Sequence, residues 1–151
     1  MILNDALLHL IVNHVPILGS ALSVLLLLIA LWLRNDPGAL LAATLVMMLT
    51  GIGAFISAET GHNAEQFVEE LSGFAEKRIE EHEERADIAM PMAVIAGIGA
   101  LVVLVLGWQR AGPIPVTWLI GLLAASLLTT AAMGWTAAAG GVIRHTEIRA
   151  P

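Results

Sequence analysis

Histidine and carboxylate side chains are the residues of this sequence that could do chemistry. The chain has five histidines, 13 acidic residues and no cysteine. Without thiolate ligands, a metal ion would be held by imidazole, carboxylate or backbone oxygen, and imidazole with carboxylate suits iron, manganese, zinc or copper. The histidines are His9, His14, His62, His82 and His145. The question is which elements bring these rings together.

The stretch around His82 gives the clearest orientation. His82 and four apolar residues recur there at spacings of four and three, so they lie on one face of a helix. These residues are Ala75, Ile79, His82, Ala86 and Ala89. Glu81 and Glu83 flank this face. The pattern predicts that His82 points inward, either as a metal ligand or as a structural histidine hydrogen-bonded to a neighbouring carboxylate.

The composition is that of an integral membrane protein. Hydrophobic residues make up 58% of the 151 residues, charged residues 13%, and the mean hydropathy is +0.83. Four segments are long and apolar enough to span a bilayer, at about residues 6–33, 39–58, 88–108 and 115–138. The links near Asn35 and Gly112 are short, which forces antiparallel neighbours. We therefore expect an all-α, up-down-up-down bundle of four transmembrane helices in a single membrane domain, residues 1–151.

The long connection between spans two and three is predicted to be helical and interfacial, over residues 62–87. Asn63 can cap a helix, Ser72-Gly73 should end it, and the next helix should continue into span three with a bend at Pro91. Pro16 should bend span one in the same way. No internal repeat is evident in the sequence.

This topology predicts that all five histidines lie on one membrane face, together with every acid except Asp36. Ionisable groups gathered at a bilayer surface are costly unless they are paired or bound to a ligand. We therefore predict an interfacial metal site for iron, copper or zinc, with a role in redox chemistry, electron transfer or metal handling. Its predicted ligands are His14, His82 and His145, with Glu65 and Glu83 as carboxylates and the Glu59-x-x-His62 pair as a further possibility.

Two other functions are compatible with the same residues. The first is a b-type haem protein in which His14 and His145 are the axial ligands. The second is an accessory or assembly subunit that binds no metal. His9 and His14 are five residues apart and face different directions on a straight helix, and His62, in a turn, would be solvated.

Charge restricts the partners and bears on the orientation. A net charge of −6 argues against nucleic acid, which leaves the lipid bilayer and other membrane subunits or further copies of this chain. Arg34 and Arg110 beside the short links favour the cytoplasm for that side and the periplasm for the histidine face. Arg85, Arg144 and Arg149 act in the opposite direction.

Three stretches carry a resemblance to a known family: residues 8–16 (LHLIVNHVP), residues 64–83, and residues 140–145 (GGVIRH). They resemble the DUF2231-like proteins, which are small bacterial four-helix membrane proteins of unknown function. The resemblance implies a bacterial inner-membrane protein of that fold, with His14, His82 and His145 as the matching histidines. Family members often carry a His-Pro pair where this chain has His9-Leu10, so the resemblance assigns no role to His9.

Overall fold

The computed structural model describes residues 5–34, 36–69, 76–110 and 112–144. Over these residues the secondary structure is helical, without strands. The segments are α1 (Asp5–Val12), α2 (His14–Trp32), α3 (Pro37–Glu69), α4 (Glu76–Trp108) and α5 (Val116–Arg144).

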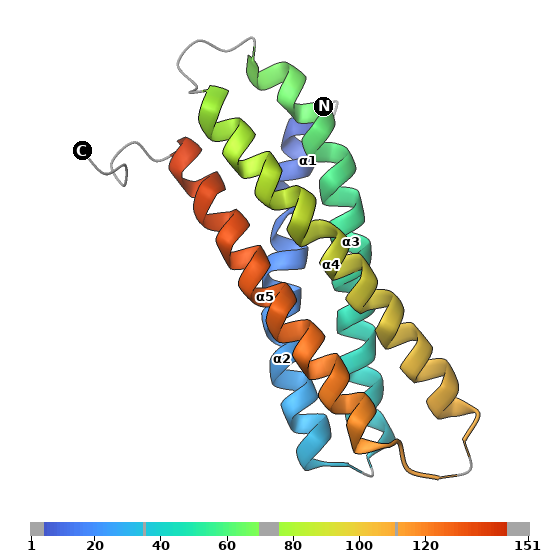
Figure 1. Ribbon diagram of the computed structural model, residues 1–151. Helices are drawn as coiled ribbons and strands as arrows, with labels where there is room; N and C mark the ends of the chain where they lie inside the picture. Colours follow the sequence, from blue (N-terminus) through green and yellow to red (C-terminus); the bar gives the residue numbers. More distant parts are fainter. Residues whose placement is uncertain (1–4, 35, 70–75, 111, 145–151) are drawn as a thin grey trace.

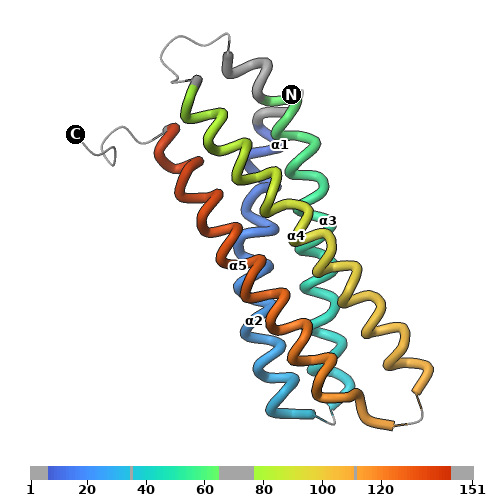
Figure 2. The backbone as a smooth tube through the Cα atoms, in the orientation of Figure 1, coloured from blue at the N-terminus to red at the C-terminus, as the bar shows by residue number. Residues whose placement is uncertain are grey.

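The helices form four rods that run up and down, since α1 and α2 are two parts of one bent rod (Figure 1). The starts of α1 and α4 and the ends of α3 and α5 lie together, and we name this the histidine end (Figure 2). All four rods in the described part of the chain are long and apolar enough to cross a membrane. The predicted fold, a helical bundle of a multi-pass membrane protein, is confirmed.

The first rod bends at Asn13, which separates α1 from α2. Pro16, one turn later, has no N–H with which to bond the Val12 carbonyl, so the ladder of backbone hydrogen bonds is interrupted here. The Asn13 amide still donates to the His9 carbonyl at 2.9 Å. The bend predicted from Pro16 is therefore present, and it lies one turn below His9.

The third element is longer than predicted. We expected span two to end near residue 58 and a new helix to begin at the Asn63 cap, but α3 runs without a break to Glu69, so that prediction is wrong. Thr60 keeps its hydroxyl on its own helix, donating to the Ile56 carbonyl at 2.8 Å, and Gly61 packs against His9. These packed contacts outweigh the local capping preference. The predicted break at Ser72-Gly73 lies outside the described residues.

The continuity predicted for the fourth element is confirmed. α4 continues from Glu76 through Pro91 to Trp108 as one helix. Pro91 lies inside this helix and is exposed. The charged stretch around His82 is thus rigidly joined to the membrane-spanning part of α4.

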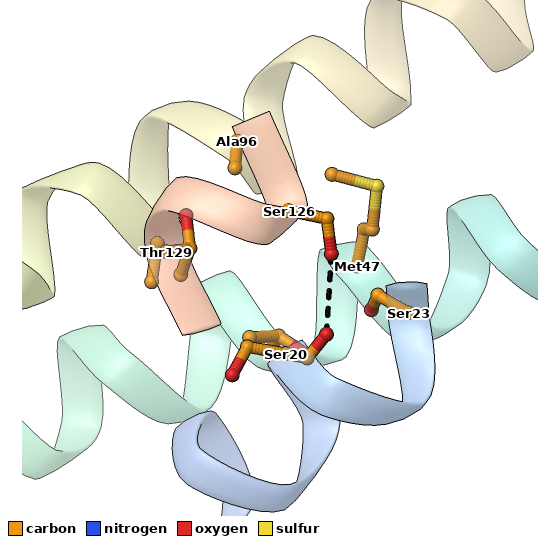
Figure 3. Close-up of a pocket in the computed structure, with 8 residues that line it drawn as sticks. Ser20, Ser23, Met47, Ala96, Ser126 and Thr129 are labelled. Carbon is orange, nitrogen blue, oxygen red and sulfur yellow. Dashed lines mark hydrogen bonds between the residues drawn. The ribbon is translucent and has the colours of Figure 1, made fainter. Parts of the chain in front are cut away.

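The rods pack in a square in which α2 and α4 each contact both α3 and α5. Between α3 and α4 the two backbones meet directly, and a side-chain carbon at Gly51 would come within 3.1 Å of the Ala93 carbonyl oxygen. Between α5 and α2, the Ser126 hydroxyl donates to the Ser20 carbonyl at 3.1 Å beside a cavity of about 10 Å³ (Figure 3). Most buried side chains are thus alanine, serine or threonine, with a few larger ones such as Leu27 and Met133, and many large apolar side chains are exposed, as expected for a membrane bundle.

Candidate functional site

His9 is held between the first rod and α3. Its Nδ1 donates to the Ser57 carbonyl at 3.0 Å. One turn further along α3, Gly61 lies against the ring, so that a side-chain carbon there would be 3.0 Å from His9 Cε1 and 3.1 Å from Nδ1. A side-chain carbon there would be tighter than an ordinary contact, so the imidazole would have to shift by a few tenths of an ångström. We name this arrangement of imidazole, carbonyl and glycine a clasp.

His82 is held in the same way between α4 and α5. Its Nδ1 donates to the Thr136 carbonyl at 3.0 Å. One turn further along α5, a side-chain carbon at Gly140 would lie 3.0 Å from His82 Cε1 and 3.2 Å from Nδ1. His82 therefore points into the bundle, as the helical spacing predicts, and it forms a second clasp with the geometry of the first.

The clasps fix the tautomer of both rings. Because a carbonyl oxygen only accepts hydrogen bonds, Nδ1 carries the proton and Nε2 of the neutral ring has a free lone pair. Among the described residues, neither Nε2 has a hydrogen-bond partner. Arg85 and Glu83 lie close enough to His82 for their charges to act on it. An imidazole oriented through Nδ1, with Nε2 available, is the form in which histidine binds metals.

The two clasps belong to a repeated pair of hairpins. We name α1, α2 and α3 the first hairpin, and α4 and α5 the second. When the two hairpins are aligned so that His9 corresponds to His82, buried residues of α2 align with buried residues of α4. These pairs are Pro16 and Ala89, Ser20 and Ala93, Ser23 and Ala96, and Leu27 and Ala100.

The same holds for α3 and α5 when Gly61 is matched to Gly140. The matched buried pairs are Ala43 and Leu122, Met47 and Ser126, Thr50 and Thr129, Ala54 and Met133, and Ser57 and Thr136. Matched residues share burial but rarely chemical type, so the repeat is not visible in the sequence. It follows that the clasps are two copies of one structural unit.

His14 lies outside this arrangement. Its side chain is exposed, and its Nδ1 donates to the Leu10 carbonyl of its own rod at 3.0 Å. The described structure does not bring it to His82. His9, which was not among the predicted ligands, is the histidine of the first rod that faces a partner helix.

The predicted carboxylate ligands lie toward the surface. Glu59 and His62 are both exposed on a regular stretch of α3. His62 Nδ1 lies 4.0 Å from Glu83 Oε1, and this contact joins the ends of α3 and α4. His62 and Glu83 therefore form a polar edge next to His82 rather than a buried centre, and Glu59 is exposed one turn before His62 on α3.

Two predicted ligands cannot be placed. His145 and the side chain of Glu65 lie outside the described part of the structure. Within the described part, no group of three or more histidine and acidic side chains is arranged to hold a metal ion. What the described residues bring to the histidine end is a pair of oriented imidazoles.

Arg85 adds a positive charge one turn from His82. Its Nη1 donates to the Trp135 carbonyl at 3.1 Å, and its guanidinium lies 4.8 Å from the centre of the Trp135 ring. Arg85 therefore joins α4 to α5 next to the His82 clasp.

Comparison with known proteins gives no relative: no family model, curated protein or solved structure matches this chain.

Proposed function

We propose that this protein is a multi-pass membrane protein that binds a transition-metal ion at its histidine end through His9 and His82. Zinc, copper and iron all accept neutral imidazole nitrogen. Each ring would use its free Nε2, while Nδ1 stays bonded to the carbonyl of the partner helix.

The observation that supports this proposal is the repetition of the clasp. A single buried histidine bonded to a carbonyl is readily explained as a structural link between helices. Here the same imidazole, carbonyl and glycine recur in both hairpins, with Cε1 of each ring 3.0 Å from the position of a side-chain carbon at the glycine. One imidazole from each hairpin would then bind a common ion, and water or a partly exposed side chain such as Glu83 would complete its coordination.

The proposal places the site at a membrane surface. We infer a bacterial inner membrane from the family resemblance and a periplasmic histidine face from Arg34 and Arg110 beside the links at the other end. A metal ion bound there would serve electron transfer or metal handling together with a further membrane subunit or a second copy of the chain.

Haem b is the second candidate, because two imidazoles of fixed tautomer are also what bis-histidine haem requires. The pair would then be His9 and His82, since His145 lies outside the described residues. Haem also needs a flat apolar slot between its axial ligands, whereas His82 has Glu81 and Glu83 beside it in the chain. A single ion needs only the two Nε2 atoms and is therefore the preferred candidate.

Metal binding by the purified protein tests the proposal. After removal of bound metal with a chelator, the detergent-solubilised chain is equilibrated with Zn²⁺ or Cu²⁺ and measured by elemental analysis. We expect about one ion per chain, and affinity lowered more than about tenfold by His9→Ala and by His82→Ala. His14→Ala and His62→Ala are matched controls on the same rods and should bind as the wild type does.

Two results would contradict the proposal. Metal retained by a double His9→Ala, His82→Ala variant would assign it to other residues, and no stoichiometric binding would favour an accessory subunit without a metal. An absorption spectrum of the protein as purified separates the second candidate, because a Soret band requires haem.

A further inference from the structure

Two buried polar atoms in the first hairpin have no hydrogen-bond partner. They are Oδ1 of Asn13 and Oγ of Ser57, and Ser57 is completely buried. The other buried hydroxyls of α3 return to their own helix; Thr50, for example, donates to the Val46 carbonyl at 2.8 Å. An unpaired buried polar group costs about 1–3 kcal/mol, so this pair of atoms calls for an explanation.

The two atoms lie at the same level of the hairpin. Below them, Gly53 of α3 packs against Val15 and Pro16, and above them Gly61 packs against His9. The first rod and α3 are antiparallel, so the residues midway between these two contacts are opposite each other. Those residues are Val12 and Asn13 on the first rod and Ser57 on α3.

The matching level of the second hairpin has no such pair. Ala86 stands where the first hairpin has Asn13. Thr136 stands where the first hairpin has Ser57, and its hydroxyl donates to the Ala132 carbonyl at 3.0 Å. The repeat therefore shows that the clasp needs neither an amide nor an unpartnered hydroxyl at this level.

The chemistry of the site is that of neutral oxygen ligands. Asn13 is the residue at which the first rod breaks, and Pro16 leaves the carbonyl of the adjacent Val12 without its helical donor. Carbonyls at broken membrane helices, with amide and hydroxyl oxygens nearby, are ligands for small monovalent cations. A divalent ion would call for carboxylates, but Glu59, two residues beyond Ser57, is exposed.

We propose that Asn13 and Ser57 form a binding site for a monovalent cation of the size of Na⁺ at the bend of the first rod. The acidic residues concentrated at the histidine end raise the local cation concentration and so favour its occupation. This site is separate from the proposed metal site, because it uses oxygen ligands one turn below His9 and does not involve Nε2.

Thermal unfolding in NaCl and in choline chloride at equal ionic strength tests this proposal. Unfolding is followed by tryptophan fluorescence. A ligand that binds only the folded chain raises the midpoint, by about 3 °C for each tenfold increase in Na⁺ above the Kd. We expect this rise in the wild type with Na⁺ and not with choline.

The variants distinguish a bound cation from simpler explanations. Asn13→Ala copies the second hairpin and should abolish the Na⁺ response, as should Ser57→Ala. Thr136→Ala, at the matched position, should retain it. Asn13→Asp adds a charged oxygen and should move the response to lower Na⁺, which keeps the proposal testable if Asn13→Ala fails to fold.

Two results would overturn the proposal. The first is the same midpoint for the wild type in both salts, with a loss of stability in Asn13→Ala that does not depend on Na⁺. That result would mean that a water molecule bridges the two atoms. The second is a Na⁺ response that persists in both Asn13→Ala and Ser57→Ala.

Discussion

The two hairpins share the imidazole, the carbonyl and the glycine of the clasp and differ in the residues around it. In the first hairpin, the level below the clasp holds the unpaired oxygens of Asn13 and Ser57. In the second, Arg85 reaches across to the carbonyl and ring of Trp135. The positions matched to Arg85 and Trp135 in the first hairpin are Val12 and Ile56.

The two hairpins therefore share one function, orienting an imidazole, and each has a further feature of its own. The part that is the same in both hairpins orients an imidazole, which requires only a carbonyl and a space for the ring. The parts that differ leave uncharged oxygens at one clasp and a positive charge at the other. The two rings are therefore equivalent in geometry and unequal in electrostatics.

The largest effect is expected from filling the space beside each imidazole. Leucine at Gly61 or Gly140 would displace a ring whose Cε1 lies 3.0 Å from the position of the added carbon. Overpacking of this kind costs about 1–3 kcal/mol, and the two substitutions should be equally harmful if the clasps are equivalent. Both should also lose metal, which unfolding titrations and elemental analysis would measure.

Gly134→Leu is the matched control for these variants. Gly134 lies on α5 as Gly140 does, is exposed, and has no atom within 4 Å of the position of an added carbon. It should unfold as the wild type does. Unequal losses for Gly61→Leu and Gly140→Leu would break the comparison and assign the site to one hairpin.

A smaller effect is expected from removing the charge that is specific to the second hairpin. Arg85→Gln loses the contact with Trp135, which is worth about 1 kcal/mol in total. It should also tighten metal binding, because the charge of Arg85 acts on His82 and opposes a bound cation. Unfolding titrations and metal binding measure the two effects separately.

Arg110→Gln is the control at the opposite end of the same two helices. Arg110 lies 5.5 Å from the centre of the Trp118 ring, and its substitution should leave metal affinity unchanged. If Arg85→Gln weakened metal binding, the charge of Arg85 would not be what distinguishes the second clasp.

Much of the fold could be predicted from the sequence. Length and hydropathy are sufficient to find the four rods, because a bilayer demands long apolar segments whatever their packing. The inward direction of His82 could be predicted because acidic residues mark the opposite face of its helix. The break expected near Asn63 was wrong, because a local capping signal does not include the packing of Gly61 against His9.

The site itself could be predicted only in part. His9 shares a helical face with Asp5 and Asn13, but polar residues at the start of a span are also expected at a membrane surface, so the spacing does not show that this face meets α3. The repeat was missed for a related reason: matched positions such as Ala54 and Met133 share burial, and burial cannot be inferred where the lipid-facing side is apolar as well. For the repeat, the one signal available in the sequence was the glycine that follows Ser57 and Thr136 by one turn.

The smallest effect concerns the contact between the hairpins. The Ser126 hydroxyl donates to the Ser20 carbonyl at 3.1 Å, and its counterpart in the first hairpin is Met47, which has no donor. Ser126→Ala should cost about 0.6 kcal/mol, the usual value for a hydrogen bond between membrane helices. Thr130→Ala is the control, because the Thr130 hydroxyl bonds to the Ser126 carbonyl within α5 and does not join the hairpins.

An unfolding titration of both variants decides what holds the hairpins together. On the α3 to α4 side the contact is made by glycine against backbone, without a side-chain hydrogen bond in the described residues. If Ser126→Ala costs no more than about 0.6 kcal/mol, close packing stabilises both the α3–α4 contact and the α2–α5 contact. The Ser126 hydroxyl then sets only the register between α5 and α2. A loss several times larger would mean that the α2–α5 contact depends on a hydrogen bond, whereas the α3–α4 contact depends on close packing. The two hairpins would then resemble each other in their clasps but not in the way they contact each other.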